Sequence, residues 1–481
     1  MIASEWLYNI ESRMPFIPTE GQHEAIECIS RFLADRTPQR HSAMILRGSA
    51  GTGKTSVARA LVCAMTDLKQ KVVLLAPTGR AAKVFSLGTG CQAHTIHRKI
   101  YRQRSYLDGR FMLNQNLHAD TLFIVDEASM INSASSSYDE HSTFGSGNLL
   151  DDLVQYVYGG RNCALMLIGD TAQLPPVGCD ESPALVASFV AGYGLDVSEY
   201  DLLEVLRQAE GSGILVNATK IRHMITYDRM TELPKIRFAG FDDISICHGA
   251  EIIEQLASSY SHAGMDETIV VTRSNKRANI YNNGIRNQVL GREEEIASGD
   301  RLMIVKNNYF WTKDSADENT PAFLANGDHC IVRRVRNMRE LYGFRFADIT
   351  IEFPDYDNYE LQVTAILDTL QSEAPALTRE EQELLYNNVL ADYAHITVKR
   401  ERMEKMRNDI YFNALQVKYA YAVTCHKAQG GQWEHVYLDQ GYMTDDMLTP
   451  SYIHWLYTAF TRATNHLYLV NWRQEQTEAE S

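Results

Sequence analysis

The chain has 481 residues, of which 45% are apolar and 22% are charged, as is typical of a folded protein with several domains. Its 46 basic and 61 acidic side chains give a formal net charge of −15, which argues against a protein that coats nucleic acid but allows a local basic channel. The eight cysteines form no CxxC pair and the histidines no zinc-ligand pattern, so a zinc site and a disulfide-rich secreted domain are both disfavoured.

The start of the chain lacks the basic and long apolar segments of a secretory signal. No apolar run approaches the ~18 residues that a membrane span needs. Scattered single cysteines are typical of reduced thiols. We therefore expect a cytoplasmic protein without a membrane partner.

Short apolar runs that end in polar motifs recur along the chain. They are residues 43–46, 72–76, 122–125 and 165–168 in the first half, and 268–271, 436–438 and 467–470 in the second. Continuous apolar runs are typical of strands buried on both faces of a parallel sheet. With helical segments between them they predict two α/β cores that meet near residue 210. Functional groups are expected at the carboxyl ends of such strands.

The first run leads into a phosphate-binding pattern, GxxxxGK[ST], at residues 48–55. Glycines in this pattern let backbone N–H groups surround phosphate oxygens, and the helix that follows favours anions at its N-terminus. Lys54 is expected to reach the β- and γ-phosphates of ATP, and the Thr55 hydroxyl is expected to bind Mg²⁺. The predicted nucleotide-binding residues are Gly48, Ser49, Ala50, Gly51, Thr52, Gly53, Lys54, Thr55 and Ser56.

Two later runs end in groups suited to phosphate chemistry. Asp126 and Glu127 follow residues 122–125, where Asp126 suits Mg²⁺ binding and Glu127 suits a base that polarises the attacking water. Gln173 follows residues 165–168 and could sense the γ-phosphate. Arg207 and Arg462 are candidates for arginine fingers, which stabilise charge in phosphoryl transfer.

Three segments fit neither core. Residues 98–120 are basic and aromatic, and Asp108-Gly109 within them predicts a two-residue hairpin turn that places Tyr106 opposite Phe111. Residues 133–147 are rich in serine and predict a flexible surface loop. Residues 328–415 begin with strand-like runs and become helical and highly charged over residues 378–407.

The order of these motifs is that of superfamily 1 helicases, and the chain resembles their RecD-like and phage Dda-like branch. The resemblance also includes APTGRAA at 76–82, YAVTCHKAQG at 421–430 and TAFTRA at 458–463. It runs from about residue 19 to residue 464. Each motif alone is weakly specific, but their ordered set is highly specific.

The resemblance implies roles for individual residues. Gln22 matches an adenine-recognising glutamine, and Gln173, Arg207 and Arg462 match groups that contact the γ-phosphate. Residues that match segments facing the DNA strand are Thr78, Thr95, His97, Thr272 and Asn275. Residues that match a segment linking nucleotide state to strand grip are Thr424, His426, Lys427 and Gln429.

The implied fold is α/β, with two RecA-like parallel-sheet P-loop cores, an inserted β-hairpin, and a small inserted SH3-like β-barrel with a helical domain. The first core would span residues 1–210, with the hairpin at 98–120. The second core would span residues 211–327 and 416–481, and the barrel and helices residues 328–415.

The implied function is that of an ATP-dependent DNA translocase and helicase that moves 5′ to 3′ and unwinds duplex DNA from a single-stranded tail. Its partners would be single-stranded DNA and junctions of single- and double-stranded DNA, and the protein is expected to be monomeric. Tyr106 or Phe111 would act as the strand-separating wedge of the hairpin, the pin.

Two alternatives stay open from the sequence. A non-motor P-loop protein, such as a GTPase-like switch or a clamp loader, would share the phosphate loop but has no place for the motifs at 424–430 and 458–463. A nucleic-acid-stimulated ATPase could also act on RNA or remodel without unwinding, because channels that follow the backbone read little of the sugar.

Overall fold

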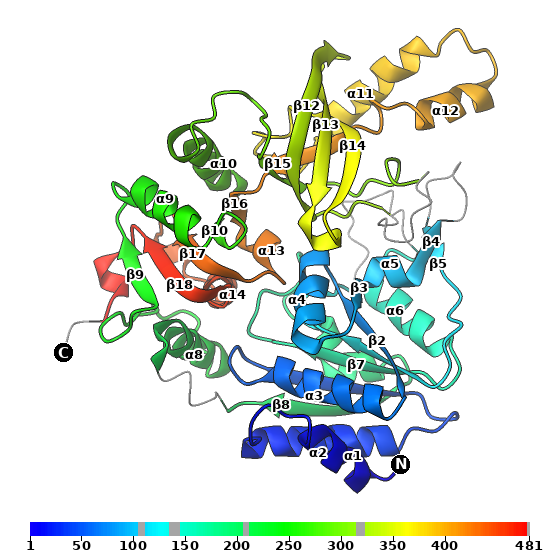
Figure 1. Ribbon diagram of the computed structural model, residues 1–481, viewed down its shortest axis with the longest axis vertical. Helices are drawn as coiled ribbons and strands as arrows, with labels where there is room; N and C mark the ends of the chain where they lie inside the picture. The colour runs from blue at the N-terminus through cyan, green and yellow to red at the C-terminus, as the bar shows by residue number, and fades with distance from the viewer. Residues whose placement is uncertain (104–110, 134–144, 205–210, 314–322, 479–481) are drawn as a thin grey trace.

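The computed structural model describes residues 1–103, 111–133, 145–204, 211–313 and 323–478. Its first core is a six-stranded sheet with the order β3-β2-β6-β7-β1-β8 (Figure 1), and all its strand pairs are parallel. The strands are β1 (Ser42–Gly48), β2 (Lys71–Ala76), β3 (Ala93–Thr95), β6 (Thr121–Val125), β7 (Ala164–Gly169) and β8 (Asp196–Leu202). The four strands predicted in this half are confirmed.

Both faces of this sheet are covered by side chains from helices, as the continuous apolar runs require. Ile45 and Leu167 pack into one apolar cluster, whereas Met44 and Met166 pack into another on the opposite face. The helices are α1 (Ala3–Glu11), α2 (Glu20–Ala34), α3 (Lys54–Asp67), α4 (Gly79–Thr89), α5 (Ile96–Ile100), α6 (Leu149–Tyr158) and α7 (Ala187–Ala191). This sheet therefore places the carboxyl ends of β1, β6 and β7 along one edge.

The second core is a five-stranded parallel sheet with the order β16-β10-β17-β18-β9. Its strands are β9 (Ile244–Cys247), β10 (Thr268–Thr272), β16 (Ala422–Thr424), β17 (Trp433–Asp439) and β18 (Ala463–Val470). Its helices are α8 (Gly213–Thr226), α9 (Ile252–His262), α10 (Asn275–Gly284), α13 (Cys425–Ala428) and α14 (Pro450–Phe460). The three strands predicted in this half are confirmed, and the chain therefore has two α/β cores.

A closed barrel of five strands stands beside the two cores (Figure 1). It consists of β11 (Arg301–Ile304), β12 (His329–Leu341), β13 (Phe344–Phe353), β14 (Tyr359–Ile366) and β15 (Leu415–Tyr419). The inserted barrel is confirmed. Its first strand, β11, lies before the boundary predicted at residue 328, because four apolar-rich residues gave too short a signal to separate it from the second core. The division of the chain into domains stays a prediction.

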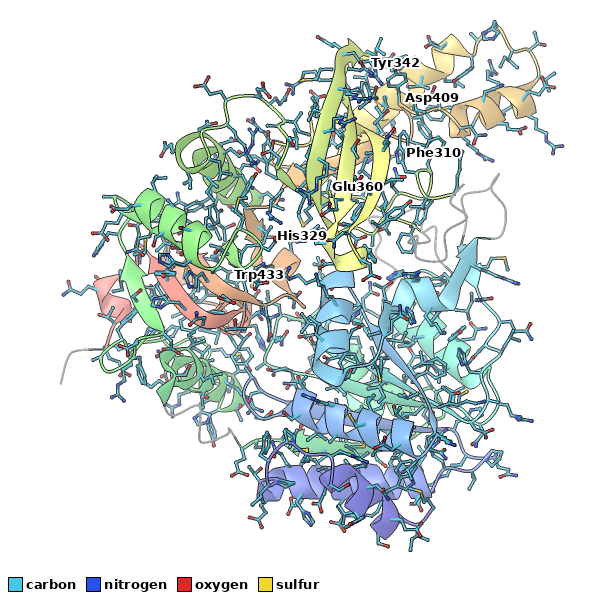
Figure 2. The ribbon with its side chains drawn as sticks, viewed as in Figure 1. Phe310, His329, Tyr342, Glu360, Asp409 and Trp433 are labelled. Carbon is cyan, nitrogen blue, oxygen red and sulfur yellow. The ribbon has the colours of Figure 1, made fainter. Side chains whose placement is uncertain are left out.

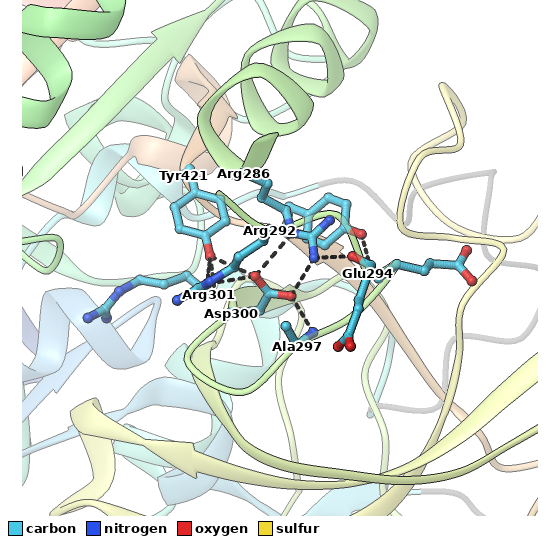
Figure 3. Close-up of polar contacts among 9 residues, drawn as sticks. Arg286, Arg292, Glu294, Ala297, Asp300, Arg301 and Tyr421 are labelled. Atoms are coloured by element: carbon cyan, nitrogen blue, oxygen red, sulfur yellow. Dashed lines mark hydrogen bonds and ion pairs between the residues drawn. The ribbon is translucent and has the colours of Figure 1, made fainter. Parts of the chain in front are cut away.

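A buried carboxylate ties the barrel to the second core (Figure 3). Asp300 is fully buried, forms ion pairs with Arg286 and Arg292, and accepts a hydrogen bond from the Tyr421 hydroxyl at 2.9 Å. Tyr421 precedes β16, and Asp300 precedes β11. The network thus fixes the start of one barrel strand against a strand of the second core.

A helical hairpin extends from the barrel between β14 and β15 (Figure 1). It consists of α11 (Arg379–Asp392) and α12 (Lys399–Arg407), so the helical prediction for residues 378–407 is confirmed. Thr378 begins α11 with a capping box, in which its side chain accepts the Glu381 N–H and Glu381 accepts the Thr378 N–H. The serine-rich stretch predicted as a surface loop falls largely outside the described residues.

The predicted hairpin exists, but its register differs from the prediction. Strands β4 (Tyr101–Gln103) and β5 (Phe111–Leu113) pair antiparallel, with Gln103 rather than Tyr106 opposite Phe111. The base of the hairpin holds this register, because the Asn114 N–H donates to the Ile100 carbonyl at 2.7 Å, next to Tyr101, which is buried and donates to Asp152 at 2.7 Å. The turn signal alone was therefore a poor guide to register. Residues 104–110 lie outside the described residues.

Among the described residues, no helix is both long and apolar enough to cross a membrane. All eight cysteines are free thiols.

Candidate nucleotide and nucleic-acid site

The phosphate-binding loop lies between β1 and α3. Gly51 and Gly53 have φ angles of 78° and 84°, in the left-handed region that favours glycine. A Cβ atom on Gly48 would lie 2.7 Å from Thr52 Oγ1 and 2.9 Å from Leu202 Cβ, which leaves no room for a side chain. The glycines of the sequence pattern are therefore required by the backbone. The loop and the α3 N-terminus form the arrangement that binds phosphate anions.

Lys54 and Gln22 contact this loop from two sides. Lys54 Nζ donates to the carbonyl oxygens of Gly48 at 2.7 Å and Ser49 at 2.9 Å, so the ammonium lies against the loop. Gln22 is fully buried, and its Nε2 donates to the Thr52 carbonyl at 3.1 Å. Its Oε1 accepts a backbone N–H at the start of α2 at 3.2 Å. Because both ends of this amide are engaged, Gln22 supports the loop, and its contact with adenine stays a prediction.

Asp126 and Glu127 follow β6, beside the loop. Asp126 Oδ1 accepts the Glu127 N–H at 2.9 Å. Burial and the neighbouring Glu127 raise the pKa of Asp126, whereas Lys54 opposes this shift. Glu127 has a φ of 52°, a conformation that costs a residue other than glycine about 1–3 kcal/mol and is common at functional sites. Two carboxylates are thus held at the edge of the sheet where phosphates are expected.

Residues 170–174, which follow β7, contact the second core. The Leu174 N–H donates to Thr458 Oγ1 at 2.8 Å, and Gln429 Nε2 donates to the Leu174 carbonyl at 2.7 Å. Gln173 lies within this segment and is 6% exposed. Its Oε1 is buried without a hydrogen-bond partner in the described part of the chain. Gln173 is therefore at the seam between the cores, and its role at the γ-phosphate stays a prediction.

The two predicted finger arginines are placed differently. Arg207 lies outside the described residues. Arg462 is 2% exposed, and its guanidinium donates to the carbonyls of Thr458 at 3.0 Å and Gly431 at 3.1 Å and to Thr461 Oγ1 at 3.0 Å. Its hydrogen bonds are therefore with the second core and not with the phosphate loop. A finger role for Arg462 requires the side chain to leave these acceptors and stays a prediction.

Replacing Arg462 with alanine is expected to destabilise the protein as well as to slow turnover. The change leaves buried acceptors without donors, at about 1–3 kcal/mol each. We expect the thermal unfolding midpoint to fall by about 5–10 °C, measured by circular dichroism. The exposed Arg59→Ala on α3 is the matched control and should change the free energy of unfolding by less than about 0.5 kcal/mol. An unchanged midpoint with lost turnover would show a purely catalytic role.

A pocket joins the first core, the second core and the barrel. It is lined by Thr78, Arg80, Met130, Asn326, Gly327, His329, His426, Lys427, Gln429, Gly431 and Trp433. Figure 2 shows His329 and Trp433 where these three parts of the protein meet. Of the residues predicted to face DNA, the pocket therefore brings together Thr78, His426 and Lys427.

The two cores approach closely at this pocket. Gly430 has a φ of 74°, and a Cβ atom there would lie 3.0 Å from Ala81 Cβ and 3.2 Å from Thr78 Oγ1. Arg80 spans the gap, since its Nη2 donates to the Gln432 carbonyl at 2.8 Å. Its guanidinium also lies over the Trp433 ring, 4.6 Å from the ring centroid. A polymer in this pocket would contact both cores at once.

Two predicted DNA-facing residues have structural roles. The Thr95 side chain caps α5 by accepting the Arg98 N–H at 3.3 Å. The His97 ring lies 5.6 Å from the Tyr101 ring and 6.3 Å from the Phe323 ring. Burial lowers the pKa of His97 to about 4, so it is neutral at pH 7. Neither residue lines the pocket, and their contacts with DNA stay predictions.

The other predicted DNA contacts lie around the second core. Thr272 is fully buried and donates to the Ser274 carbonyl at 3.1 Å, whereas Asn275 Nδ2 donates to the Glu373 carbonyl at 3.2 Å. Thr424 ends β16 and begins α13, next to the pocket residue His426. Of the two wedge residues predicted on the hairpin, Tyr106 lies outside the described residues, and only the strand position of Phe111 is described.

Several site residues were missed by sequence reasoning. They are Arg80, Asn326, His329 and Trp433 in the pocket, and Arg222 and Tyr457 at the phosphate loop. Arg80 lies within the recognised motif at 76–82 and Tyr457 directly precedes the one at 458–463, so their position in the sequence was a usable signal. Arg222 and His329 lie within a helix and at the start of a strand without any motif around them. Only the folded chain brings them to the site.

Residues 20–224 match a family model described as an AAA domain, and residues 419–470 match one described as a UvrD-like helicase C-terminal domain. The ATP-dependent RecD2 DNA helicase of Deinococcus radiodurans is 33% identical over 184 residues, which are 38% of this chain and 22% of that protein. The ATP-dependent DNA helicase Dda of Enterobacteria phage T4 is 23% identical over 433 residues, which are 86% of this chain and 90% of that one.

These matches make the protein a superfamily 1 helicase of the RecD type. This helicase is therefore an ATP-dependent enzyme. A solved structure of Pif1 helicases at forked duplex DNA is 15% identical, covers 97% of this chain and 95% of that one, and has a TM-score of 0.49. The helicase thus matches most of the length of Dda but less than a quarter of RecD2.

The residues beside the loop fit the divalent cation that ATP chemistry requires. Thr55 is the second residue of α3, and Asp126 is a carboxylate whose pKa burial has raised. A nearby cation would stabilise the charged form of the Asp126 carboxylate, which burial disfavours. Mg²⁺ usually combines one or two protein oxygen ligands with phosphates and water. In the described residues, no group of three or more His, Cys, Asp or Glu side chains is arranged to hold a metal by itself.

Proposed function

We propose that the protein is an ATP-driven motor that moves 5′ to 3′ along single-stranded DNA and unwinds duplex DNA from a single-stranded tail. The observation that supports it is the position of the phosphate loop at the seam between two parallel-sheet cores. The Ala50 N–H donates to the Tyr457 hydroxyl of α14 at 3.1 Å, so the second core contacts the loop itself. Nucleotide binding and loss would therefore change the relation between the cores.

The proposed mechanism couples this seam to the pocket on the two cores. Thr78 belongs to the first core and Lys427 to the second, and both line the pocket. If each holds a phosphate of the strand, closing and opening of the seam moves one contact relative to the other. Glu127 would orient and polarise the water, and Lys54 would hold the phosphates. Mg²⁺, when bound at Thr55 and Asp126, would neutralise charge on the phosphates.

The pH dependence of DNA binding is expected to depend on Lys427. Burial lowers the pKa of Lys427 to about 8, below its ordinary value, and phosphate binds the charged form. Affinity for single-stranded DNA should therefore fall as pH rises from 7 to 9.5, by up to about tenfold per unit above 8. Lys427→Arg should flatten this dependence because a guanidinium stays charged. Fluorescence anisotropy at constant ionic strength measures it, and equal slopes in the two proteins would contradict the assignment.

The hairpin of β4 and β5 is proposed as the strand-separating pin, with Tyr106 or Phe111 as the wedge. Replacing residues 102–115 by a short Gly-Ser link removes both candidate wedges and keeps the Tyr101 anchor. DNA-stimulated ATP turnover should persist, because the loop and the pocket are untouched. Unwinding of a tailed duplex, measured by release of a labelled strand, should be lost. Unwinding at the normal rate per ATP would show that the hairpin is not the pin.

Affinity for the strand is expected to depend on salt as well. Each phosphate that is neutralised releases counterions, so affinity should fall steeply between 50 and 200 mM salt. A basic patch on β12 consists of Arg333, Arg334, Arg336 and Arg339. Its charge is partly neutralised, because Arg333 is paired with Glu352 and Arg339 with Asp348. A monomeric state and a cytoplasmic location stay predictions from the sequence.

The alternative functions differ in the fold and in the nucleic acid that they require. A single-core switch does not fit, since the chain has a second α/β core whose helix α14 contacts the phosphate loop. An RNA-directed ATPase or a remodeller that does not unwind would share the site described above. The test compares ATP turnover with DNA and RNA oligonucleotides of one sequence. Stimulation by DNA alone supports the proposal, stimulation by RNA alone assigns RNA as the track, and no stimulation by either contradicts a motor.

A further inference from the structure

An arginine of the second core reaches the phosphate loop. Arg222 lies on α8, and its Nη1 donates to Ser49 Oγ at 3.0 Å. Helix α8 packs against α14 and β18, so it belongs to the second core. Ser49 is 4% exposed and follows the end of β1. The contact therefore crosses the seam between the cores at the second residue of the phosphate-binding pattern.

A second contact holds the next residue of the loop. Besides accepting the Ala50 N–H, the Tyr457 hydroxyl donates to Asp170 Oδ2 at 2.5 Å, and Tyr457 is 1% exposed. Burial and the adjacent Asp170 raise the pKa of this hydroxyl well above its ordinary value, so it stays protonated and can donate. Two consecutive loop residues are thus held by two helices of the second core, and Arg222 provides the positive charge of the pair.

The partner of Arg222 is a weak one for a guanidinium. A neutral hydroxyl accepts one hydrogen bond from a planar group that carries five N–H donors. A terminal phosphate in the same loop would offer several anionic oxygens, and hydrogen bonds between charged groups are roughly twice as strong as neutral ones. The Arg462 guanidinium, by contrast, is already satisfied by three acceptors of its own core.

We propose that Arg222 is a γ-phosphate-contacting residue, which exchanges Ser49 for the terminal phosphate of ATP and so carries a charge of the second core to the nucleotide. This rests on the proposed function only in that the loop binds ATP. The role adds to those expected of Arg207 and Arg462 and does not replace them. It predicts that Arg222 raises affinity for ATP but not for ADP, because only ATP has the terminal phosphate that Arg222 contacts.

The test compares affinities for ADP and for a slowly hydrolysed ATP analogue in one set of variants. Arg222→Gln keeps a donor for Ser49 but removes the charge, and Arg222→Lys keeps the charge. Lys220→Gln is the matched control, because Lys220 lies on the same helix and pairs with Glu478, away from the loop. Dissociation constants come from fluorescence titration, and DNA-stimulated turnover from phosphate release.

We expect Arg222→Gln to lower affinity for the ATP analogue at least about tenfold while ADP affinity changes less than about twofold, since a charged hydrogen bond to the terminal phosphate is lost only with ATP. Turnover should fall about tenfold to a hundredfold, and Arg222→Lys should recover part of both. An equal loss of affinity for the two nucleotides, or no loss for either, would overturn the proposal. The ratio is measured within each variant and so does not depend on its stability. If the wild-type protein binds neither nucleotide, it is the proposed function that fails.

Discussion

Replacing Lys54 with alanine is expected to lower ATP turnover by about a hundredfold to a thousandfold or more and to leave the protein folded. In the wild-type protein the Lys54 ammonium is expected to stabilise charge on the β- and γ-phosphates. Losing one such preorganised group lowers the rate by about 10²–10³ or more. The hydrogen bonds of Lys54 are to the carbonyls of Gly48 and Ser49 in the loop. The side chain therefore supports the nucleotide site and not the apolar core.

This prediction is checked by phosphate release with and without single-stranded DNA, and by thermal unfolding of the same preparation. The control is Lys71→Ala, an exposed lysine at the start of β2 in the same core. It should keep both turnover and unfolding midpoint. Normal turnover in folded Lys54→Ala would refute the assignment of the phosphate loop.

Replacing Glu127 with glutamine is expected to trap ATP on the protein without hydrolysing it. Glutamine has nearly the same shape and keeps the backbone conformation at φ 52°, but it cannot accept a proton from water. General base catalysis contributes about 10²–10⁴ in rate, so turnover should fall by that factor. Nucleotide affinity should stay within a few-fold of the wild type, because the groups that bind the phosphates remain.

The measurement for Glu127 pairs single-turnover hydrolysis with titration of bound nucleotide. Asp126→Asn is the informative comparison: its effect on nucleotide affinity should depend on Mg²⁺, whereas that of Glu127→Gln should not. If Glu127→Gln failed to bind nucleotide, Glu127 would be a metal ligand or a structural residue, and the base would have to be sought elsewhere.

The sequence predicts those parts of the fold that depend on local signals. The runs before residues 48, 126 and 170 are buried strands whose side chains pack on both faces, so their apolar character is visible without the structure. The edge strands β3, β8 and β9 were missed because they are short or have polar residues on an exposed face. The barrel strand β11 was missed because it has only four residues.

The hairpin and the seam show what local signals cannot supply. The turn at Asp108-Gly109 predicted one register, but the strands pair in another, which the hydrogen bond from Asn114 to Ile100 at the base of the hairpin continues. In the same way Arg222 reaches Ser49 only because α8 packs on the second core beside α14, and no spacing within α8 indicates that contact. Arg462 was recognised by its motif, yet its position among carbonyl acceptors depends on the fold of the whole second core.

The central claim is that ATP hydrolysis drives this protein 5′ to 3′ along DNA and separates the strands ahead. The measurement is release of a labelled strand from a duplex with only a 5′ or only a 3′ single-stranded tail, with ATP and Mg²⁺, and with Lys54→Ala as the inactive control. The account predicts unwinding of the 5′-tailed duplex and none of the 3′-tailed one. Unwinding of the 3′-tailed duplex alone, or of neither despite DNA-stimulated ATP turnover, would contradict it.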